Sequence, residues 1–203
     1  GGGKSTLAKL IAGIEKPVSG RILFDQEDIT EKSITDRANM GISYAFQQPV
    51  RFKGLTVRDL LHLSTSKQKS DQELSQYLTE VGLNASNYIN REINASLSGG
   101  ELKRIEIAML MARGVDLSLF DEPEAGIDLW SFHNLIKVFE QIRDTKRGAV
   151  VIISHQERIL NIADKIVVIS NGEIDTVGTR DEILPKLLSQ SDTYQFHKVR
   201  EQQ

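Results

Sequence analysis

The sequence predicts an α/β domain built around a mostly parallel sheet. Short apolar strands alternate along the chain with segments of helical periodicity, which is the pattern of parallel sheets flanked by helices. Ala149–Ile153 is apolar and rich in β-branched residues without alternation, as strands covered on both faces are. The 203 residues suffice for one domain with a small subdomain.

The first half of the chain is expected to open with a helix. Apolar side chains between Leu7 and Ile14 recur at helical spacing, so the helix begins near Lys4 and ends before Pro17. The next expected elements are a strand at Arg21–Phe24, a strand at Ile42–Phe46, a polar helical stretch from about Thr56 to Glu80 and a loop at Asn84–Asn94.

The second half alternates more regularly between helices and strands. Its expected helices are Ser98–Arg113, Asp128–Arg143, Glu157–Ala163 and Arg180–Leu188. Its expected strands are Leu117–Phe120, Ala149–Ile153, Ile166–Ile169 and Glu173–Val177, and Ser191–Gln203 is predicted to be a polar tail.

Composition excludes several classes of function. The net charge of -3 excludes a strongly basic nucleic-acid binder, so no nucleic-acid partner is expected. The chain has no cysteine and therefore no thiolate for zinc or an iron–sulfur cluster. No apolar run approaches the roughly 18 residues that a membrane span needs, so a cytoplasmic location is expected. Because the sequence starts inside a motif and without methionine, we expect it to belong to a longer protein.

A glycine-rich segment directly precedes the first helix. Gly1–Thr6 reads GGGKST, and glycines there let backbone N–H groups approach phosphates at a helix N-terminus. Lys4 can reach the β- and γ-phosphates, and the Ser5 hydroxyl can bind Mg²⁺. The alternative is a flexible glycine cap before an ordinary helix.

Two carboxylates end the strand at Leu117–Phe120. Ligands bind at the carboxyl ends of parallel strands, which places Asp121 and Glu122 near the phosphate loop. Asp121 can hold Mg²⁺, and Glu122 can polarise an attacking water. The alternative is an acidic pair that only stabilises a helix N-terminus.

A third motif, LSGGE at Leu97–Glu101, opens the helix that ends at Arg113. Its Ser98, Gly99 and Gly100 present a hydroxyl and backbone N–H groups, a second phosphate-binding surface. The spacing of Ser98 and Glu101 also fits a capping box, and both interpretations can hold together.

The ordered set of motifs resembles the ABC-type ATPases. GGGKST looks like their Walker A motif, FQQP at Phe46–Pro49 like the Q-loop and LSGGE like the signature. LFDE at Leu119–Glu122 looks like Walker B, the segment to Asp128 like the D-loop and Ser154-His155 like the switch histidine. The resemblance covers essentially the whole chain and implies a P-loop ATPase core with a small helical subdomain.

The resemblance implies a role for each motif, with ATP and Mg²⁺ as cofactors. Glu122 would be the general base, and Lys4, Gln47 and His155 would act with it in catalysis. The residues implied to bind nucleotide are Gly1, Gly2, Gly3, Lys4, Ser5, Thr6, Gln47, Ser98, Gly99, Gly100, Asp128 and His155. The residues implied at the metal are Ser5, Gln47 and Asp121.

The family also implies a second copy of the chain as partner. Ser98, Gly99 and Gly100 would complete the site of a facing subunit, so hydrolysis would need an ATP-closed head-to-tail dimer coupled through Asp128. The expected parts are a core at 1–49 and 114–190, a helical subdomain at 50–113 and a tail at 191–203. The family's β-subdomain, its adenine-stacking aromatic and the strand before the phosphate loop are missing from this sequence and expected upstream of Gly1.

Two kinds of ABC-type ATPase fit these motifs. A third interpretation is that the sequence is an inactive fragment. The preferred one is the SufC-type ATPase of iron–sulfur cluster assembly with SufB- and SufD-like scaffold partners, which several segments resemble. Glu101 and Glu124-Ala125 stand where transporter ATPases more often carry Gln and Thr-Ser or Thr-Ala. The alternative is the ATPase subunit of a membrane importer, whose Q-loop and residues 50–95 would grip a permease.

Overall fold

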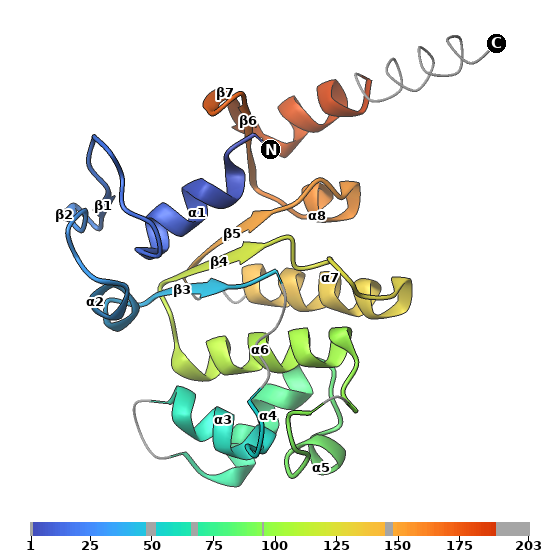
Figure 1. Cartoon of the computed structure of the whole chain (residues 1–203). Coiled ribbons are helices and arrows are strands. Elements are labelled where there is room, and N and C mark those ends of the chain that lie inside the picture. Colours follow the sequence, from blue (N-terminus) through green and yellow to red (C-terminus); the bar gives the residue numbers. More distant parts are fainter. Residues whose placement is uncertain (1, 48–51, 66–68, 95, 145–147, 190–203) are drawn as a thin grey trace. The chain divides into compact units, whose positions relative to one another are not determined.

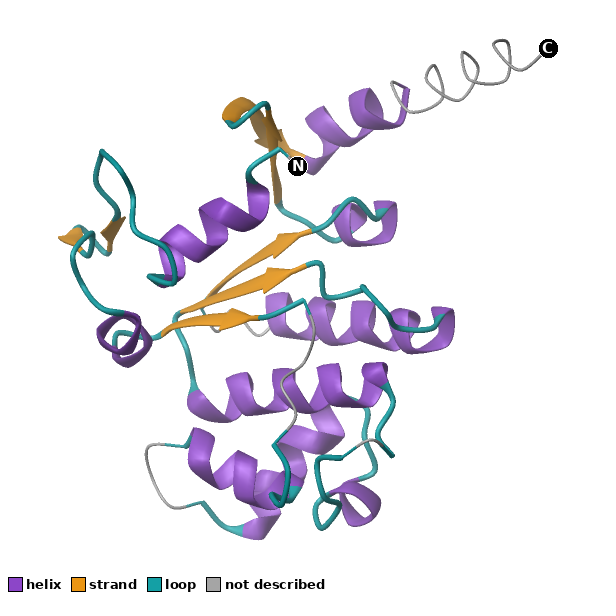
Figure 2. Ribbon diagram, in the orientation of Figure 1, coloured by secondary structure: helices purple, strands orange, loops and turns teal. Residues whose placement is uncertain are grey.

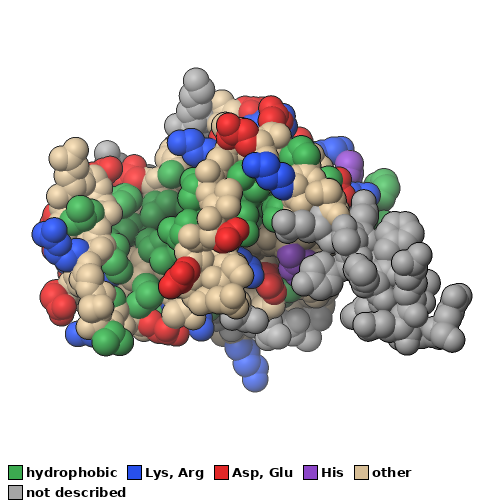
Figure 3. Space-filling model, turned by 90° about the horizontal axis from the view of Figure 1, so that it is seen from above, with side chains coloured by type: hydrophobic (Ala, Val, Ile, Leu, Met, Phe, Trp, Pro, Cys, Tyr) green, Lys and Arg blue, Asp and Glu red, His purple; other side chains and the backbone are tan. Residues whose placement is uncertain are grey.

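The computed structural model describes residues 2–47, 52–65, 69–94, 96–144 and 148–189. The chain divides into two compact units. The larger is Ser5–Ser154, and the smaller combines Gly1–Lys4 with His155–Gln203. Within the described ranges, no helix combines the length and the apolar character of a membrane span. On the face in Figure 3, basic and acidic side chains are interspersed.

The larger unit is built on a parallel sheet, as predicted. Its strands β3 (Ile42–Ala45), β4 (Leu117–Asp121) and β5 (Ala149–Ile153) follow the order β3-β4-β5 (Figure 1). β4 pairs in parallel with both neighbours. The three strands therefore end at the same edge of the sheet, where ligands of parallel sheets bind.

The central strand β4 is covered on both faces. Leu119 is fully buried in a cluster with Ala12, at the end of helix α1 (Lys4–Ala12), and with Ile42. The next residue, Phe120, points to the opposite face because strand side chains alternate. Its ring packs edge-on against Phe139 of α7 (Leu129–Asp144), with centroids 5.0 Å apart.

Helix α6 (Gly99–Arg113) joins the sheet layer to a group of shorter helices. It lies between α7 on one side and α3 (Val57–Ser64) and α4 (Asp71–Glu80) on the other (Figure 2). The larger unit also contains α2 (Ile34–Asn39), α5 (Ala85–Tyr88) and the two-residue strands β1 (Leu23–Phe24) and β2 (Glu27–Asp28).

The smaller unit contains an antiparallel hairpin. Strands β6 (Lys165–Ser170) and β7 (Glu173–Thr179) meet at a turn in which Asn171 and Gly172 have positive φ. α8 (Glu157–Asn161) precedes the hairpin, and a helix at 180–189 follows it. Ile166 packs with Ile183 and Leu184 of that helix in a separate apolar cluster.

Three sequence predictions need correction. The helical stretch from Thr56 to Glu80 is two helices, because Thr56 and Ser70 each form a capping box that starts a new one. The Asn84–Asn94 loop contains α5, and the strand at Arg21–Phe24 shrinks to β1.

The covering of β5 also differs from prediction. Its burial alternates, and Val151 is 43% exposed although a strand covered on both faces was expected. β5 stands at the end of the strand order of its sheet, so it has the partial exposure of an edge strand.

Candidate nucleotide-binding site

The residues predicted at the strand ends come together at one edge of the sheet. Asp121 ends β4, Glu122 follows it and Gln47 lies two residues beyond β3. Ser5 reaches the same place from the first turn of α1. Parallel pairing of β3 with β4 explains the meeting, since residues far apart in sequence then share one edge.

Asp121 is held by two hydroxyl groups. Ser5 Oγ donates to Asp121 Oδ1 at 2.9 Å, and Tyr44 Oη donates to Oδ2 at 2.8 Å. Asp121 as a residue is only 6% exposed, so these donors replace much of the hydration of its carboxylate. Burial and the hydrogen bond to Asp121 raise the pKa of the Tyr44 phenol far above its usual value, which keeps it a donor at neutral pH.

Glu122 faces a different environment from its neighbour. Gln47 Nε2 donates to Glu122 Oε2 at 2.8 Å, and the Glu122 N–H donates to the Ile153 carbonyl at 2.9 Å. Its φ of 44° lies in the left-handed region, which is unfavourable for a residue with a side chain. Such conformations concentrate at active sites, where the fold fixes a side chain in one direction.

A buried cation on α6 fixes the backbone next to Gln47. Lys103 is 1% exposed, and its Nζ donates to the Phe46 carbonyl at 2.6 Å and to Glu106 Oε2 at 2.8 Å. Burial raises the pKa of Glu106, and Lys103 and the Phe46 N–H partly offset that rise. Helix α6 is thus tied to the segment that carries Gln47.

The signature motif starts α6 through the predicted capping box. Glu101 N–H donates to Ser98 Oγ at 3.2 Å, and Ser98 N–H donates to Glu101 Oε2 at 2.7 Å. A Cβ at Gly99 would lie 3.1 Å from the Gly126 carbonyl oxygen, and one at Gly100 would lie 2.5 Å from Ser131 Cβ. These glycines therefore allow α6 to pack closely against the start of α7.

Asp128 has a local role at the start of α7. Its Oδ1 accepts hydrogen bonds from the backbone N–H groups of Trp130 at 3.0 Å and Ser131 at 2.9 Å. The hydrogen bonds from Ser131, and then those from the backbone of Asp128 and Trp130, hold the pKa of this carboxyl below its usual range.

The other residues predicted to bind nucleotide belong to the smaller unit or do not lie at the sheet edge that carries Asp121 and Glu122. Gly2, Gly3 and Lys4 belong to the smaller unit, and His155 begins its second segment. Gly1 lies outside the described residues, as do Gln48 and Pro49 of the predicted Q-loop. Thr6 is exposed in the first turn of α1.

The loop glycines are closely approached by backbone within the smaller unit. A Cβ at Gly2 would lie 3.0 Å from the Ile169 carbonyl oxygen, and Gly3 has a φ of 90°. Positive φ and contact with backbone both favour glycine. The loop thus has the side-chain-free backbone that phosphate binding requires.

The side-chain oxygens of Ser5 and Asp121 are suitable ligands for Mg²⁺. Mg²⁺ is usually bound by one or two protein oxygens together with waters and substrate phosphates, and Ser5 and Asp121 provide such a pair. Among the described residues, no cluster of three or more His, Cys, Asp or Glu could hold a metal.

Sequence reasoning missed Tyr44 and the pair Lys103–Glu106. A tyrosine in a buried strand is an ordinary strand residue, and only its position three residues before Gln47 could have drawn attention to it. Lys103 and Glu106 are three apart on a helix, which is also the pattern of a solvated surface pair. Burial distinguishes these cases, and it is a property of the fold.

A glycine-rich loop that leads into a helix, and a parallel strand whose terminal aspartate accepts a hydrogen bond from Ser5 of that helix and is followed by a glutamate, define a P-loop nucleotide hydrolase. Comparison with known proteins narrows this class. The family model described as ABC transporter matches residues 1–125. The chain belongs to this family and is an ATP-binding cassette ATPase.

Two curated relatives and one solved structure illustrate the likeness. An uncharacterised ABC transporter ATP-binding protein of Methanocaldococcus jannaschii is 40% identical over 191 residues, which cover 90% of this chain and 76% of the relative. A sulfate/thiosulfate import ATP-binding protein of Mesorhizobium japonicum is 34% identical over 90% of this chain, which spans 54% of that relative.

The solved structure is a dimeric ATP-binding cassette in a post-hydrolysis state, bound to ADP and Pi. It superposes with a TM-score of 0.75 and 20% identity, covering 88% of this chain and 81% of that one. At this identity the likeness establishes the fold alone, and it confirms the predicted ABC ATPase fold.

Proposed function

We propose that this protein is the ATP-hydrolysing subunit of a membrane transporter, working as a head-to-tail dimer of two copies. The relatives support the transporter role, since one is named for sulfate/thiosulfate import. That name belongs to the relative, and the cargo of this protein is not part of the proposal. The dimer is supported by the solved cassette of the same fold, which is dimeric.

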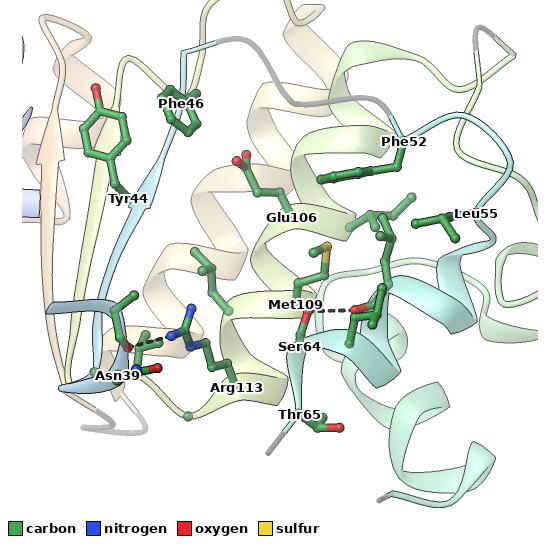
Figure 4. A pocket seen from close by; sticks show the side chains of 18 of the residues that line it. Asn39, Tyr44, Phe46, Phe52, Leu55, Ser64, Thr65, Glu106, Met109 and Arg113 are labelled. Atoms are coloured by element: carbon green, nitrogen blue, oxygen red, sulfur yellow. Dashed lines mark hydrogen bonds between the residues drawn. The ribbon is translucent and has the colours of Figure 1, made fainter. Parts of the chain in front are cut away.

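A groove in the larger unit offers a place for the membrane partner. It has a volume of about 850 Å³ and lies between the sheet edge at β3 and the helices α3 and α6. Phe46, Phe52, Leu55 and Met109 line it, and the Glu106 carboxylate lies between Phe46 and Phe52 (Figure 4). Such a mainly apolar groove suits an amphipathic helix of a permease.

The observation that carries the proposal is the continuity of this groove with the chemical site. Phe46 lines the groove, and the next residue, Gln47, donates to Glu122. A helix that displaces Phe46 would therefore move Gln47 relative to the glutamate. This arrangement would couple docking of a partner to hydrolysis.

The proposed chemistry assigns each group one task. The loop at Gly1–Thr6 and Lys4 would bind the phosphates of ATP, and Ser5, Gln47 and Asp121 would hold Mg²⁺. Mg²⁺, when bound, supplies charge neutralisation at the phosphates. Glu122 would accept a proton from the attacking water, and His155 would contact the γ-phosphate.

In the proposed dimer, part of each nucleotide site would be supplied by the facing copy of the chain. Ser98, Gly99 and Gly100 stand at the N-terminus of α6, where the helix dipole favours anions. In the dimer they would face the γ-phosphate bound by the other copy, with Asp128 coupling the two sites. ATP binding would close the dimer, and hydrolysis would release it.

A second candidate is the SufC-type ATPase that powers iron–sulfur cluster assembly on SufB- and SufD-like scaffolds. Two local features favour it. Glu101 stands in the capping box and accepts a hydrogen bond from Tyr88, and Glu124 accepts one from Ser154. Both residues stand where transporter ATPases more often carry Gln and Thr. The names of the relatives favour the transporter over this candidate.

Partner capture tests the proposal. The full-length protein carrying Glu122→Gln, tagged and supplied with ATP, would be isolated from native extract and from detergent-solubilised membranes. We expect a polytopic membrane protein in the detergent fraction. Recovery of soluble scaffold subunits without detergent would contradict the transporter role and establish the assembly role.

Phe52→Glu, which places a charge in the groove, should reduce capture of a permease, whereas Lys16→Glu on the exposed surface should not.

A further inference from the structure

The carboxylate of Asp121 is oriented by three elements that meet at one face of the sheet. Tyr44 pairs with Leu119 across β3 and β4, so their side chains share a face. Asp121 lies two residues beyond Leu119 and therefore projects from that face as well. Helix α1, which supplies Ser5, packs on the same face through Ala12.

The two oxygens of Asp121 have different donors. Ser5 Oγ, a group suited to bind Mg²⁺, faces Oδ1, whereas the Tyr44 hydroxyl engages Oδ2. A tyrosine hydroxyl bonded to one oxygen fixes the rotation of the carboxylate about its Cβ–Cγ bond. The other oxygen then stays directed toward Ser5.

Tyr44 is itself held in place. Its ring meets the Phe46 ring edge-on, with centroids 5.0 Å apart and planes at 80°. The ring thus has a packed position, and its hydroxyl is preorganised toward Asp121. Tyr44 in β3 and Gln47, two residues beyond β3, donate hydrogen bonds to Asp121 and Glu122 respectively.

We propose that Tyr44 is a positioning residue of the metal site, whose hydroxyl orients Asp121 so that Asp121 and Ser5 together bind the Mg²⁺ of Mg–ATP. The inference rests on the proposed nucleotide chemistry of this site. Tyr44 contacts neither nucleotide nor metal in this account and acts only through Asp121.

Removal of the Tyr44 hydroxyl should reduce the increase in nucleotide affinity that Mg²⁺ brings. In Tyr44→Phe, Asp121 Oδ2 loses its donor while the ring and its packing remain. A hydrogen bond to a charged group is worth about tenfold in an equilibrium constant, so the gain in nucleotide affinity on adding Mg²⁺ should fall by about tenfold. Affinity in EDTA should be unchanged, since the phosphate loop is intact.

The experiment measures dissociation constants rather than turnover. A fluorescent, non-hydrolysable ATP analogue is titrated into the full-length protein with Mg²⁺ and with EDTA, for wild type, Tyr44→Phe and the matched hydroxyl deletion Tyr77→Phe on α4. Tyr77→Phe should behave as wild type. Equal Mg²⁺ gains in Tyr44→Phe and wild type would overturn the proposal, and so would an equal loss with Mg²⁺ and with EDTA.

A double-mutant cycle separates positioning from general stability. In an Asp121→Asn background, Tyr44→Phe should cause no further loss of the Mg²⁺-dependent gain, because the group that it orients is already absent. Full additivity of the two changes would contradict the proposed role. If wild type binds no nucleotide with or without Mg²⁺, it is the proposed function that fails, and the wild-type titration distinguishes that result from a failure of Tyr44 alone.

Discussion

At the scale of single residues, two adjacent carboxylates of the site have different surroundings. Asp121 is buried and accepts two hydroxyl donors, whereas Glu122 adopts a left-handed backbone conformation and contacts the Gln47 amide. A buried carboxylate held by two hydroxyls suits a metal, and Glu122, which lacks these donors, is the carboxylate to which we assign the proposed proton transfer. This difference underlies the assignment of Glu122 as base.

Glu122→Gln should remove turnover and preserve nucleotide binding. The amide keeps the size of the side chain but accepts no proton from water, so we expect ATPase activity to fall at least a hundredfold. Phosphate release and ATP-analogue affinity would be measured side by side. Lys4→Ala is the comparison, because it should weaken binding itself. Turnover near the wild-type rate in Glu122→Gln would rule out the assigned base.

At the scale of helices and strands, burial decides which local sequence patterns matter. Lys103 and Glu106 form an ordinary helical pair by spacing, yet the Lys103 side chain is 1% exposed and its ammonium donates a hydrogen bond to the Phe46 carbonyl. The pair therefore links α6, which begins with the signature motif, to the segment before Gln47. A link of this kind can transmit a displacement from one motif to the other.

Lys103→Met should destabilise the larger unit by about 3 kcal/mol, because it leaves the Glu106 carboxylate and the Phe46 carbonyl without their buried cation. Urea unfolding would measure the loss. Lys32→Met, which breaks an exposed pair with Glu27, should cost much less. A similar loss of unfolding free energy in the two variants would show that the buried pair stabilises the protein no more than the exposed one. Lys103→Met combined with Glu106→Leu should recover part of the stability.

The capping boxes predict how stability depends on pH. Thr56 Oγ1 and its N–H donate to Asp59 and lower the pKa of that carboxyl, and Ser70 does the same for Glu73. Because the folded-state pKa is lower than the unfolded one, the contribution to stability is complete above about pH 5 and is lost as pH falls through the folded-state values.

The double variant Asp59→Asn, Glu73→Gln should therefore flatten the dependence of the unfolding free energy on pH between about 5 and 3. Urea unfolding at several pH values measures this slope, and Glu140→Gln, far from the start of α7, is the control. A slope identical to that of wild type would mean that these caps do not bind protons differently in the two states.

Much of the order of strands and helices was predictable from the sequence, but the short elements β2, α2 and α5 and several contacts were not. Ala149–Ile153 was found at its observed bounds because a run of β-branched residues is a local signal. The break between α3 and α4 was missed although Ser70 and Glu73 match a capping box, since periodic leucines on both sides suggested one helix. The bond from Tyr44 to Asp121 depends on pairing across 77 residues, which no local pattern specifies.

At the scale of the whole molecule, the edge formed by α6 and α7 has the features of a surface for a second copy. Gly99 and Gly100 bring the start of α6 against Gly126 and Ser131, so the signature motif and the start of α7 form one continuous edge. Trp130 on this edge is 79% exposed, and its neighbour Leu129 is 70% exposed. Exposed apolar side chains next to the signature motif suit the proposed contact, which would form only with ATP.

Trp130 should report closure of the proposed dimer, because it is the single tryptophan of the chain. When a facing copy covers it, its emission should shift to shorter wavelength, and the shift should grow with protein concentration and need ATP. Glu122→Gln, which would hold ATP without turnover, should show the largest shift, while Lys4→Ala should show none. Light scattering on the same samples would follow mass. A doubling of mass with unchanged emission would place the dimer contact elsewhere, and ATP binding without any change in mass would contradict the head-to-tail dimer itself.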